Sequence, residues 1–243
     1  MPSHINCFKK LPHAKMRLIC FPYAGAAASA FRLWPKALPE QIELCAVDFP
    51  GRVHLKESAA QDMQELVDII YPEILPYFDK NCAFFTHSFG SIVAYEIVKR
   101  LASEGIFPLH FFVSSRHPPH VPLGKPITYN LSDNDFVKAT EKQYGAISQV
   151  ILKNKDLLAL FLPVLKSDMK INETYSESIQ HPLQIPITLY YGLEDHSNDL
   201  ANLERWKEVT TGTFRVKSFQ GGHFYIDTAR EALIKDILET LKI

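Results

Sequence analysis

Residues 82–91 read Cys-Ala-Phe-Phe-Thr-His-Ser-Phe-Gly-Ser. An apolar run leads into Ser88, and residues 91–100 carry apolar side chains at helical spacing. The pattern predicts a buried strand, a sharp turn at Ser88 and a helix. A serine on such a turn projects from the carboxyl edge of a parallel sheet, toward which the first N–H groups of the new helix also point. This geometry suits a nucleophile.

The turn matches only half of the usual Gly-x-Ser-x-Gly pattern, in which small residues avoid crowding the neighbouring strand and helix. Gly90 fills the second glycine position, whereas Thr86 replaces the first and predicts a tighter fit. A serine that caps a helix after a buried strand explains Ser88 equally well. The nucleophile hypothesis therefore depends on partners elsewhere in the chain.

The composition is that of an ordinary globular protein, with 243 residues of which 47% are hydrophobic and 22% charged. It predicts one domain over residues 1–243. The 26 basic and 27 acidic residues leave a net charge of −1, which gives no electrostatic reason to expect nucleic acid or a membrane as partner. The four cysteines form no Cys-x-x-Cys pair, so we expect buried free thiols rather than disulfides or metal ligands.

The sequence shows no targeting signal. Its first twenty residues lack an apolar core followed by a small-residue cleavage site. No segment approaches the roughly 18 apolar residues of a membrane span. We therefore expect a protein of the cytoplasm.

Apolar segments that read as strands alternate with helical patterns along the chain. Besides the run before Ser88, strands are expected at residues 16–21, 42–47, 109–113, 187–191 and 213–219, and helices at 30–38, 60–78, 91–100, 200–209 and 226–241. This alternation predicts an α/β protein with a mostly parallel central sheet, helices on both faces and ligands at the carboxyl ends of the strands. The last strand alternates in polarity and should lie near a sheet edge.

A long segment without a convincing strand separates residues 113 and 187. Helical patterns cover residues 133–144, 155–165 and 167–174, which predicts a helical lid inserted at about 125–178 over the carboxyl edge. Candidates to line a substrate chamber beneath it are Phe136, Val150, Leu157, Leu160 and Phe161. Packing within the lid explains any one of them equally well.

Two later loops contain partners for Ser88. A serine hydroxyl needs a base within hydrogen-bond reach and a third group that orients the base. His223 follows the last strand in a glycine-containing loop, and a carboxylate follows the preceding strand. With Asp195 as that carboxylate, the order Ser88, Asp195, His223 is the order of α/β-hydrolases. Nearby rivals for the orienting role are Glu194, His196 and Asp199.

Acyl transfer also needs backbone N–H donors for the oxyanion. One should be the N–H of Phe89, directly after the nucleophile. The other should come from the small-residue loop after the first strand, where the N–H of Ala24 is the best candidate.

With these residues placed, the chain resembles type II thioesterases of polyketide and nonribosomal peptide synthetase systems, which are α/β-hydrolases. The resemblance covers nearly the full length. The matching segments are Cys-Phe-Pro-Tyr-Ala-Gly at 20–25, Phe-Pro-Gly-Arg at 49–52, His-Ser-Phe-Gly at 87–90, Leu-Pro-Val-Leu-Lys-Ser-Asp at 162–168 with Glu-Thr-Tyr at 173–175, and Gly-Gly-His-Phe at 221–224.

The resemblance implies an editing enzyme that hydrolyses acyl groups from the phosphopantetheine arm of acyl or peptidyl carrier proteins. It implies the triad Ser88, Asp195 and His223, and thereby ranks Asp195 above its neighbours. We also expect no cofactor, no metal and a monomer. Substrate contacts are expected from Tyr23, Phe136 and Phe161.

Four residues depart from the family pattern, namely Thr86, Phe89, Tyr23 and Ala26. If the Phe89 side chain narrows the acyl entrance, small or slender acyl groups should be preferred. Two other functions stay open at this point: a generic carboxylesterase with the same triad, and a non-catalytic carrier-binding module that kept the fold.

Overall fold

A computed structural model describes residues 3–52, 56–145 and 147–243. Within these ranges the chain forms a seven-stranded sheet in the order β1-β3-β2-β4-β5-β6-β7. The strands are β1 (Ile5–Asn6), β2 (Met16–Phe21), β3 (Ile42–Val47), β4 (Asn81–Thr86), β5 (Phe111–Ser114), β6 (Ile187–Gly192) and β7 (Phe214–Phe219). All neighbours pair in parallel except β1, which runs antiparallel to β3. At two residues, β1 is too short to leave a periodic signal in the sequence.

Both faces of the central strands are buried. Along β4, for example, Phe84 belongs to the core on one side of the sheet and Phe85 to the core on the other. Strands covered on both faces need apolar residues at every position, which is why they read as continuous apolar runs. In β7 the side chains alternate between half-buried and exposed, and the strand lies at the sheet edge, as predicted.

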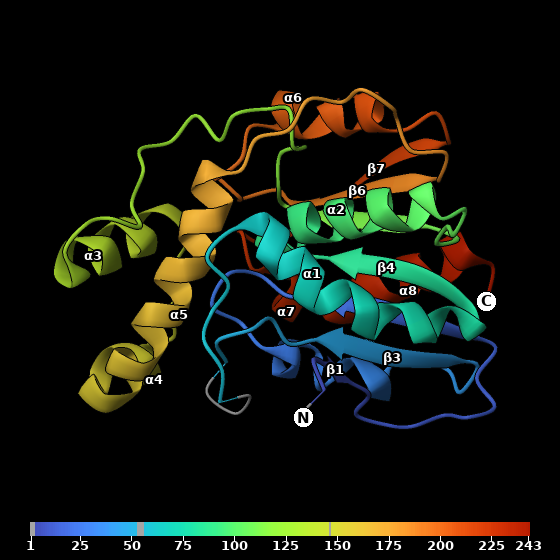
Figure 1. Ribbon diagram of the computed structural model, residues 1–243, viewed down its shortest axis with the longest axis horizontal. Coiled ribbons are helices and arrows are strands. Elements are labelled where there is room, and N and C mark those ends of the chain that lie inside the picture. Colours follow the sequence, from blue (N-terminus) through green and yellow to red (C-terminus); the bar gives the residue numbers. More distant parts are fainter. Residues whose placement is uncertain (1–2, 53–55, 146) are drawn as a thin grey trace.

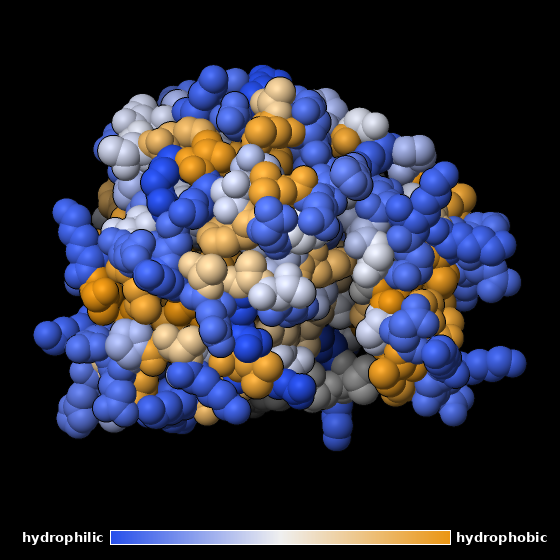
Figure 2. Space-filling model, turned by 180° about the vertical axis from the view of Figure 1, so that it is seen from behind, coloured by the Kyte–Doolittle hydropathy of each residue, from blue (hydrophilic) through white to orange (hydrophobic). Residues whose placement is uncertain are grey.

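Helices cover the two faces of the sheet (Figure 1). On one side lie α1 (Met63–Ile74) and α2 (Phe89–Ser103), and on the other lie α7 (Tyr225–Thr228) and α8 (Arg230–Leu241). Among the described residues, none of the helices combines the length and apolar character needed to cross a bilayer. Seen from behind, the surface has separate apolar patches interrupted by hydrophilic side chains (Figure 2).

Four expected helices are shorter or broken, and the one expected at 226–241 is α7 followed by α8. The helix expected at 30–38 is instead two 3-10 helices, η1 (Ala28–Phe31) and η2 (Trp34–Lys36), because Pro35 has no N–H to continue an α-helix. Where a helix was expected at 60–78, α1 gives way to η4 (Leu75–Asp79), which contains Pro76. The helix expected at 200–209 is α6 (Leu200–Leu203) followed by η5 (Glu204–Val209).

Between β5 and β6 lie α3 (Asp133–Tyr144), α4 (Gln149–Lys153) and α5 (Lys155–Thr174). In Figure 1, α5 stands across the carboxyl edge of the sheet, with α3 and α4 beyond it. The prediction of separate helices at 155–165 and 167–174 was wrong, because α5 is continuous and includes Pro163. The polar residues at the expected boundary between the two helices have hydrogen-bond partners. Lys166 Nζ donates to the Leu131 carbonyl, and Ser167 Oγ donates to the Ala60 carbonyl.

Candidate active site

Ser88 occupies the tight turn between β4 and α2, with backbone φ 52° and ψ −123°. This left-handed conformation is unusual for a residue with a side chain and indicates a backbone held by its surroundings. The Ser88 N–H donates to the Ser114 carbonyl (2.8 Å) and the His87 N–H to the Phe21 carbonyl (3.1 Å). Gly90 is required, because a Cβ there would lie 2.5 Å from the Phe21 carbonyl oxygen.

The structure brings the three residues of the expected triad together. His223 Nε2 lies 3.1 Å from Ser88 Oγ, and His223 Nδ1 lies 2.9 Å from Asp195 Oδ2. Each of the three follows the end of a strand, namely β4, β6 or β7. The three rivals of Asp195 for the orienting role are exposed, namely Glu194, His196 and Asp199. The Asp199 side chain instead caps the helix α6.

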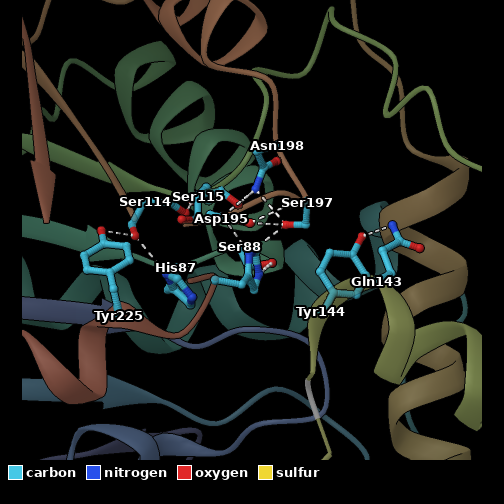
Figure 3. Close-up of polar contacts among 12 residues, drawn as sticks. His87, Ser88, Ser114, Ser115, Gln143, Tyr144, Asp195, Ser197, Asn198 and Tyr225 are labelled. Carbon is cyan, nitrogen blue, oxygen red and sulfur yellow. Dashed lines mark hydrogen bonds and ion pairs between the residues drawn. The ribbon is translucent and has the colours of Figure 1, made fainter. Parts of the chain in front are cut away.

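The Asp195 carboxylate accepts further hydrogen bonds from the turn that follows it (Figure 3). The donors are the Ser197 N–H (3.0 Å), the Ser197 hydroxyl and Asn198 Nδ2 (2.9 Å). Burial raises the pKa of the Asp195 carboxyl, but the hydrogen bonds from His223, Ser197 and Asn198 outweigh burial and hold the pKa well below its usual range. The group is therefore an ionised acceptor, which assigns the shared proton to His223 Nδ1.

Sequence reasoning missed Ser197 and Asn198. Ser197 Oγ also lies 3.0 Å from His223 Nδ1, so this hydroxyl touches both the base and its orienting carboxylate. Asn198 Nδ2 donates in addition to the Ser115 carbonyl (3.2 Å), which ties the turn after β6 to the end of β5. The one signal in the sequence is that both residues directly follow Asp195 at a strand end.

His87 supports the site from behind. Its Nδ1 lies 2.8 Å from Ser114 Oγ, and Ser114 Oγ lies 2.6 Å from the Tyr225 hydroxyl (Figure 3). Its ring packs 5.2 Å from the His223 ring. Burial and the neighbouring His223 hold the pKa of His87 well below its usual value, so the imidazole is neutral. His87 is therefore a buried packing residue behind the site.

The two expected oxyanion donors belong to different loops. Ala24 lies in a turn closed by the Ala26 N–H, which donates to the Tyr23 carbonyl (3.0 Å). Within the described part of the chain, neither the Ala24 N–H nor the Phe89 N–H donates a hydrogen bond.

The Phe89 side chain does not narrow the acyl entrance. It is fully buried and packs edge-to-face against Phe49, with 5.5 Å between ring centroids. The first residue of α2 points into the core there, so the expected size preference has no basis in Phe89.

A small cavity of about 20 Å³ adjoins the Ser88 hydroxyl. Its lining comes from the loops and the lid and consists of Tyr23, Ala24, Ser88, Thr140, Tyr144, Leu165, Met169, Asn172, His223 and Phe224. Tyr23 also borders a groove of about 600 Å³ that runs between the turn after β2 and the lid helices. In this form the cavity has room for little more than a water molecule.

The expected lining residues are distributed differently. Tyr23 borders the cavity, and Phe161 borders the neighbouring groove. Phe136 borders neither and is fully buried in the lid core. The remaining three side chains, Val150, Leu157 and Leu160, are exposed.

The described ranges contain no cluster of three or more histidine, cysteine or acidic side chains arranged to hold a metal ion. The cysteines Cys7, Cys20, Cys45 and Cys82 are free thiols, and all but the half-buried Cys7 are buried.

Comparison with known proteins identifies the family. A family profile described as "Thioesterase domain" matches residues 16–241. The chain belongs to the thioesterase family. The gramicidin S biosynthesis protein GrsT of Aneurinibacillus migulanus is 31% identical over 95% of this chain and 90% of its own length. The medium-chain S-acyl fatty acid synthase thioesterase of Rattus norvegicus is 33% identical over 91% of this chain and 86% of its own.

Solved structures agree with this assignment. The type II thioesterase BorB of the borrelidin biosynthetic cluster superposes with a TM-score of 0.88, 29% identity and 98% coverage of both chains. ClbQ of the colibactin NRPS/PKS pathway gives a TM-score of 0.88 at 27% identity, over 94% of this chain and 98% of its own. This thioesterase therefore has the α/β-hydrolase fold, and its relatives include type II thioesterases of biosynthetic pathways.

Proposed function

We propose that this thioesterase hydrolyses acyl groups from the phosphopantetheine arm of acyl or peptidyl carrier proteins and acts as an editing enzyme of a secondary-metabolite pathway. The observation that carries the proposal is the hydrogen-bonded series Ser88, His223, Asp195 beneath the lid helices. The pathway assignment rests on GrsT, BorB and ClbQ, whose names place them in biosynthetic clusters.

In the proposed mechanism, the Ser88 hydroxyl attacks the thioester carbonyl while His223 Nε2 accepts its proton. The ionised Asp195 holds the Nδ1 proton and stabilises the imidazolium that forms. Collapse of the tetrahedral intermediate breaks the C–S bond, and His223 returns the proton to the departing thiol. Water then repeats the attack on the acyl-serine, releasing the acid and restoring Ser88.

The N–H groups of Ala24 and Phe89 are the proposed oxyanion donors. Their support is that neither donates elsewhere in the described part of the chain and that Ala24 borders the cavity beside Ser88. Backbone donors aimed at the developing charge typically contribute 10²–10³ each in turnover.

The groove beside Tyr23 is the proposed route for the carrier's arm, which is about 20 Å long by extended-chain reach. The turn after β2 and the lid residues Ser148, Ile151 and Phe161 form its walls, and Arg32 and Arg230 offer positive charge to a phosphate. Residues 125–178 would act as the lid of a single domain spanning 1–243. Substrate contacts from Phe136 would require it to leave the lid core. A cytoplasmic monomer without a cofactor completes the proposal.

The decisive test is the release of free thiol from an acyl-carrier thioester by the wild-type enzyme and by Ser88→Ala. The variant should lose essentially all turnover, whereas Ser103→Ala, which changes an exposed serine on the same helix, should keep it. A Ser88→Ala enzyme with wild-type turnover contradicts the assignment.

Three further assays separate the alternative functions. Faster cleavage of a simple oxygen ester than of the carrier thioester would favour a carboxylesterase. Absence of Ser88-dependent fluorophosphonate labelling would favour a non-catalytic carrier-binding module. A strong preference for medium-chain fatty acyl carriers would favour the role named for the rat relative.

A further inference from the structure

One carboxylate joins the lid to the turn after β2. Asp168, on α5, accepts a hydrogen bond from the Gly25 N–H (2.7 Å) through Oδ2. The same carboxylate pairs with the Arg52 guanidinium, with Nη2 to Oδ2 at 2.7 Å and Nη1 to Oδ1 at 3.1 Å. Asp168 and Arg52 are 3% and 4% exposed, so this is a two-point ion pair away from water.

The turn and the lid helix are also in direct contact. Phe161, Leu165 and Asp168 are spaced i, i+4 and i+7 and therefore lie on one face of α5. A Cβ on Gly25 would meet Phe161 Cζ at 2.9 Å and Leu165 Cδ1 at 3.0 Å, and Gly25 has φ +76°. Glycine favours this positive φ, and a Cβ here would force the tips of the Phe161 and Leu165 side chains to shift.

Arg52 reaches both loops that carry the oxyanion donors. Its Nε and Nη2 donate to the Ala26 carbonyl at 2.9 and 2.7 Å, on the turn that contains Ala24. Its guanidinium lies 5.1 Å above the Phe49 ring, and that ring packs against Phe89. The turn after β2 is thus held at the two residues that directly follow Ala24, at the Gly25 N–H by Asp168 and at the Ala26 carbonyl by Arg52.

We propose that Asp168 and Arg52 are positioning residues that hold the Ala24 N–H in the oxyanion hole only while α5 is seated on the turn. If α5 moves away, the Gly25 N–H loses its acceptor and the Arg52 guanidinium loses its carboxylate partner, and leaving a buried charge without its counter-ion is costly. Lid movement and assembly of the oxyanion hole are therefore coupled. This inference rests on the proposed function, since it deepens the role of the Ala24 N–H.

The test compares Asp168→Asn and Arg52→Lys with the control Asp133→Asn. The control removes the carboxylate of an exposed ion pair, that of Lys166 with Asp133, which also involves the lid. Asp168→Asn keeps the side chain's shape but loses the charge. Arg52→Lys keeps the charge but cannot make the two-point contact.

We expect Asp168→Asn to lower kcat about 10- to 100-fold with KM changed less than threefold, because a misplaced oxyanion donor acts on the transition state. The kcat of Arg52→Lys should lie between those of Asp168→Asn and the wild type. Amide hydrogen exchange of the segment that contains Gly25 should be faster in both variants and unchanged in Asp133→Asn. Melting temperatures separate local effects from unfolding.

A further variant, Asp168→Asn combined with Arg52→Lys, tests whether the pair acts as a unit. The losses in kcat should then not add, whereas additive losses would overturn the coupling. Wild-type kcat in a folded Asp168→Asn enzyme, or unchanged exchange at Gly25, would also overturn it.

The inference and the proposed function fail in different ways. If the wild-type enzyme releases no thiol from carrier thioesters, the proposed function fails. The positioning role then stands or falls on the rate of fluorophosphonate labelling of Ser88 and on exchange at Gly25, which need no thioester. Slower labelling and faster exchange in Asp168→Asn support it, and wild-type values overturn it.

Discussion

The polar groups around Asp195 form a graded series in their contact with the proposed base. The carboxylate contacts His223 Nδ1 directly, Ser197 Oγ contacts both groups, and Asn198 contacts the carboxylate but not the imidazole. Contributions to catalysis should follow that order, because the ionised carboxylate is the acceptor that fixes the proton on Nδ1, whereas Ser197 and Asn198 support that carboxylate.

Asp195→Asn is expected to lower kcat by about 10⁴, because the amide no longer fixes the proton on Nδ1. Ser197→Ala should lower kcat about 3- to 10-fold, since the bond from His223 to Asp195 remains but loses one supporting donor. Steady-state thiol release measures both. Equal losses in the two variants, or none in Ser197→Ala, would contradict this order.

At this scale the sequence predicts the three residues that sit at strand ends, because the carboxyl ends of parallel strands meet at one edge. It does not predict Ser197 or Asn198. Their roles depend on the backbone path of the turn after β6, which places an N–H, a hydroxyl and an amide on the same carboxylate. Residue spacing carries no information on such side-chain directions.

Among the elements, the junction of β4, β5 and α2 explains the unusual Thr86. Its hydroxyl lies 2.9 Å from Ser91 Oγ on α2 and donates to the Phe112 carbonyl on β5 at 3.0 Å. The tighter fit expected from a β-branched residue is thus accompanied by two buried hydrogen bonds. Thr86 connects three elements at a position where the usual glycine connects none.

Thr86→Val is expected to lower the free energy of unfolding by about 1–3 kcal/mol, because Ser91 Oγ and the Phe112 carbonyl lose a buried partner. Thr86→Gly, which restores the usual residue, should also be destabilising because it leaves a cavity. Urea unfolding measures both. A Thr86→Gly protein at least as stable as the wild type would contradict the assignment of a bonding role.

The same junction requires Gly90. Gly90→Ala should unfold at a markedly lower urea concentration than the wild type. The new Cβ would lie 2.5 Å from the carbonyl oxygens of Phe21 and Pro22, so the backbone would have to shift. Gly222→Ala is the matched control, since the nearest atom to its Cβ would be the Glu194 carbonyl oxygen at an ordinary 3.6 Å. Equal unfolding midpoints for the two variants would refute the role of this contact.

Helix boundaries were the weakest part of the sequence prediction. Pro35 ends a helical pattern because its missing N–H falls inside the expected helix, whereas Pro163 is tolerated within α5. Local sequence does not separate the two cases. What sustains α5 across Pro163 is tertiary: Phe161 and Leu165 pack on Gly25, and Asp168 binds Arg52.

For the whole molecule, long-range contacts decide what the sequence leaves open. The mostly parallel sheet and the meeting of its strand ends follow from the alternation of strands and helices. The position of the lid on the sheet does not follow from this alternation, because Asp168 contacts Gly25 and Arg52, which are 143 and 116 residues away in the sequence. Such pairs become visible only when the backbone is folded.

Buried neutral histidines should also give the whole molecule an acid-sensitive stability. Burial, with a smaller effect of Arg215, lowers the pKa of His110 to about 4, and its Nε2 lies 2.8 Å from Thr188 Oγ1. Burial likewise lowers the pKa of His117 to about 4. In the unfolded chain a histidine titrates near 6.5.

The sign of the pH dependence follows from proton binding. Between pH 6.5 and 4 the unfolded chain takes up a proton at residue 110 that the folded protein does not, so acid favours unfolding. This contribution to stability is fully present above pH 6.5 and is lost as the pH falls toward 4.

His110→Gln keeps a partner for Thr188 but cannot titrate. The loss of unfolding free energy from pH 7 to 4.5 should therefore be about 2 kcal/mol smaller in His110→Gln than in the wild type. His13→Gln, a change at an exposed histidine, should retain the wild-type loss. Urea unfolding of the three proteins at both pH values measures this, and an identical pH dependence in all three would show that His110 is not held neutral by the fold.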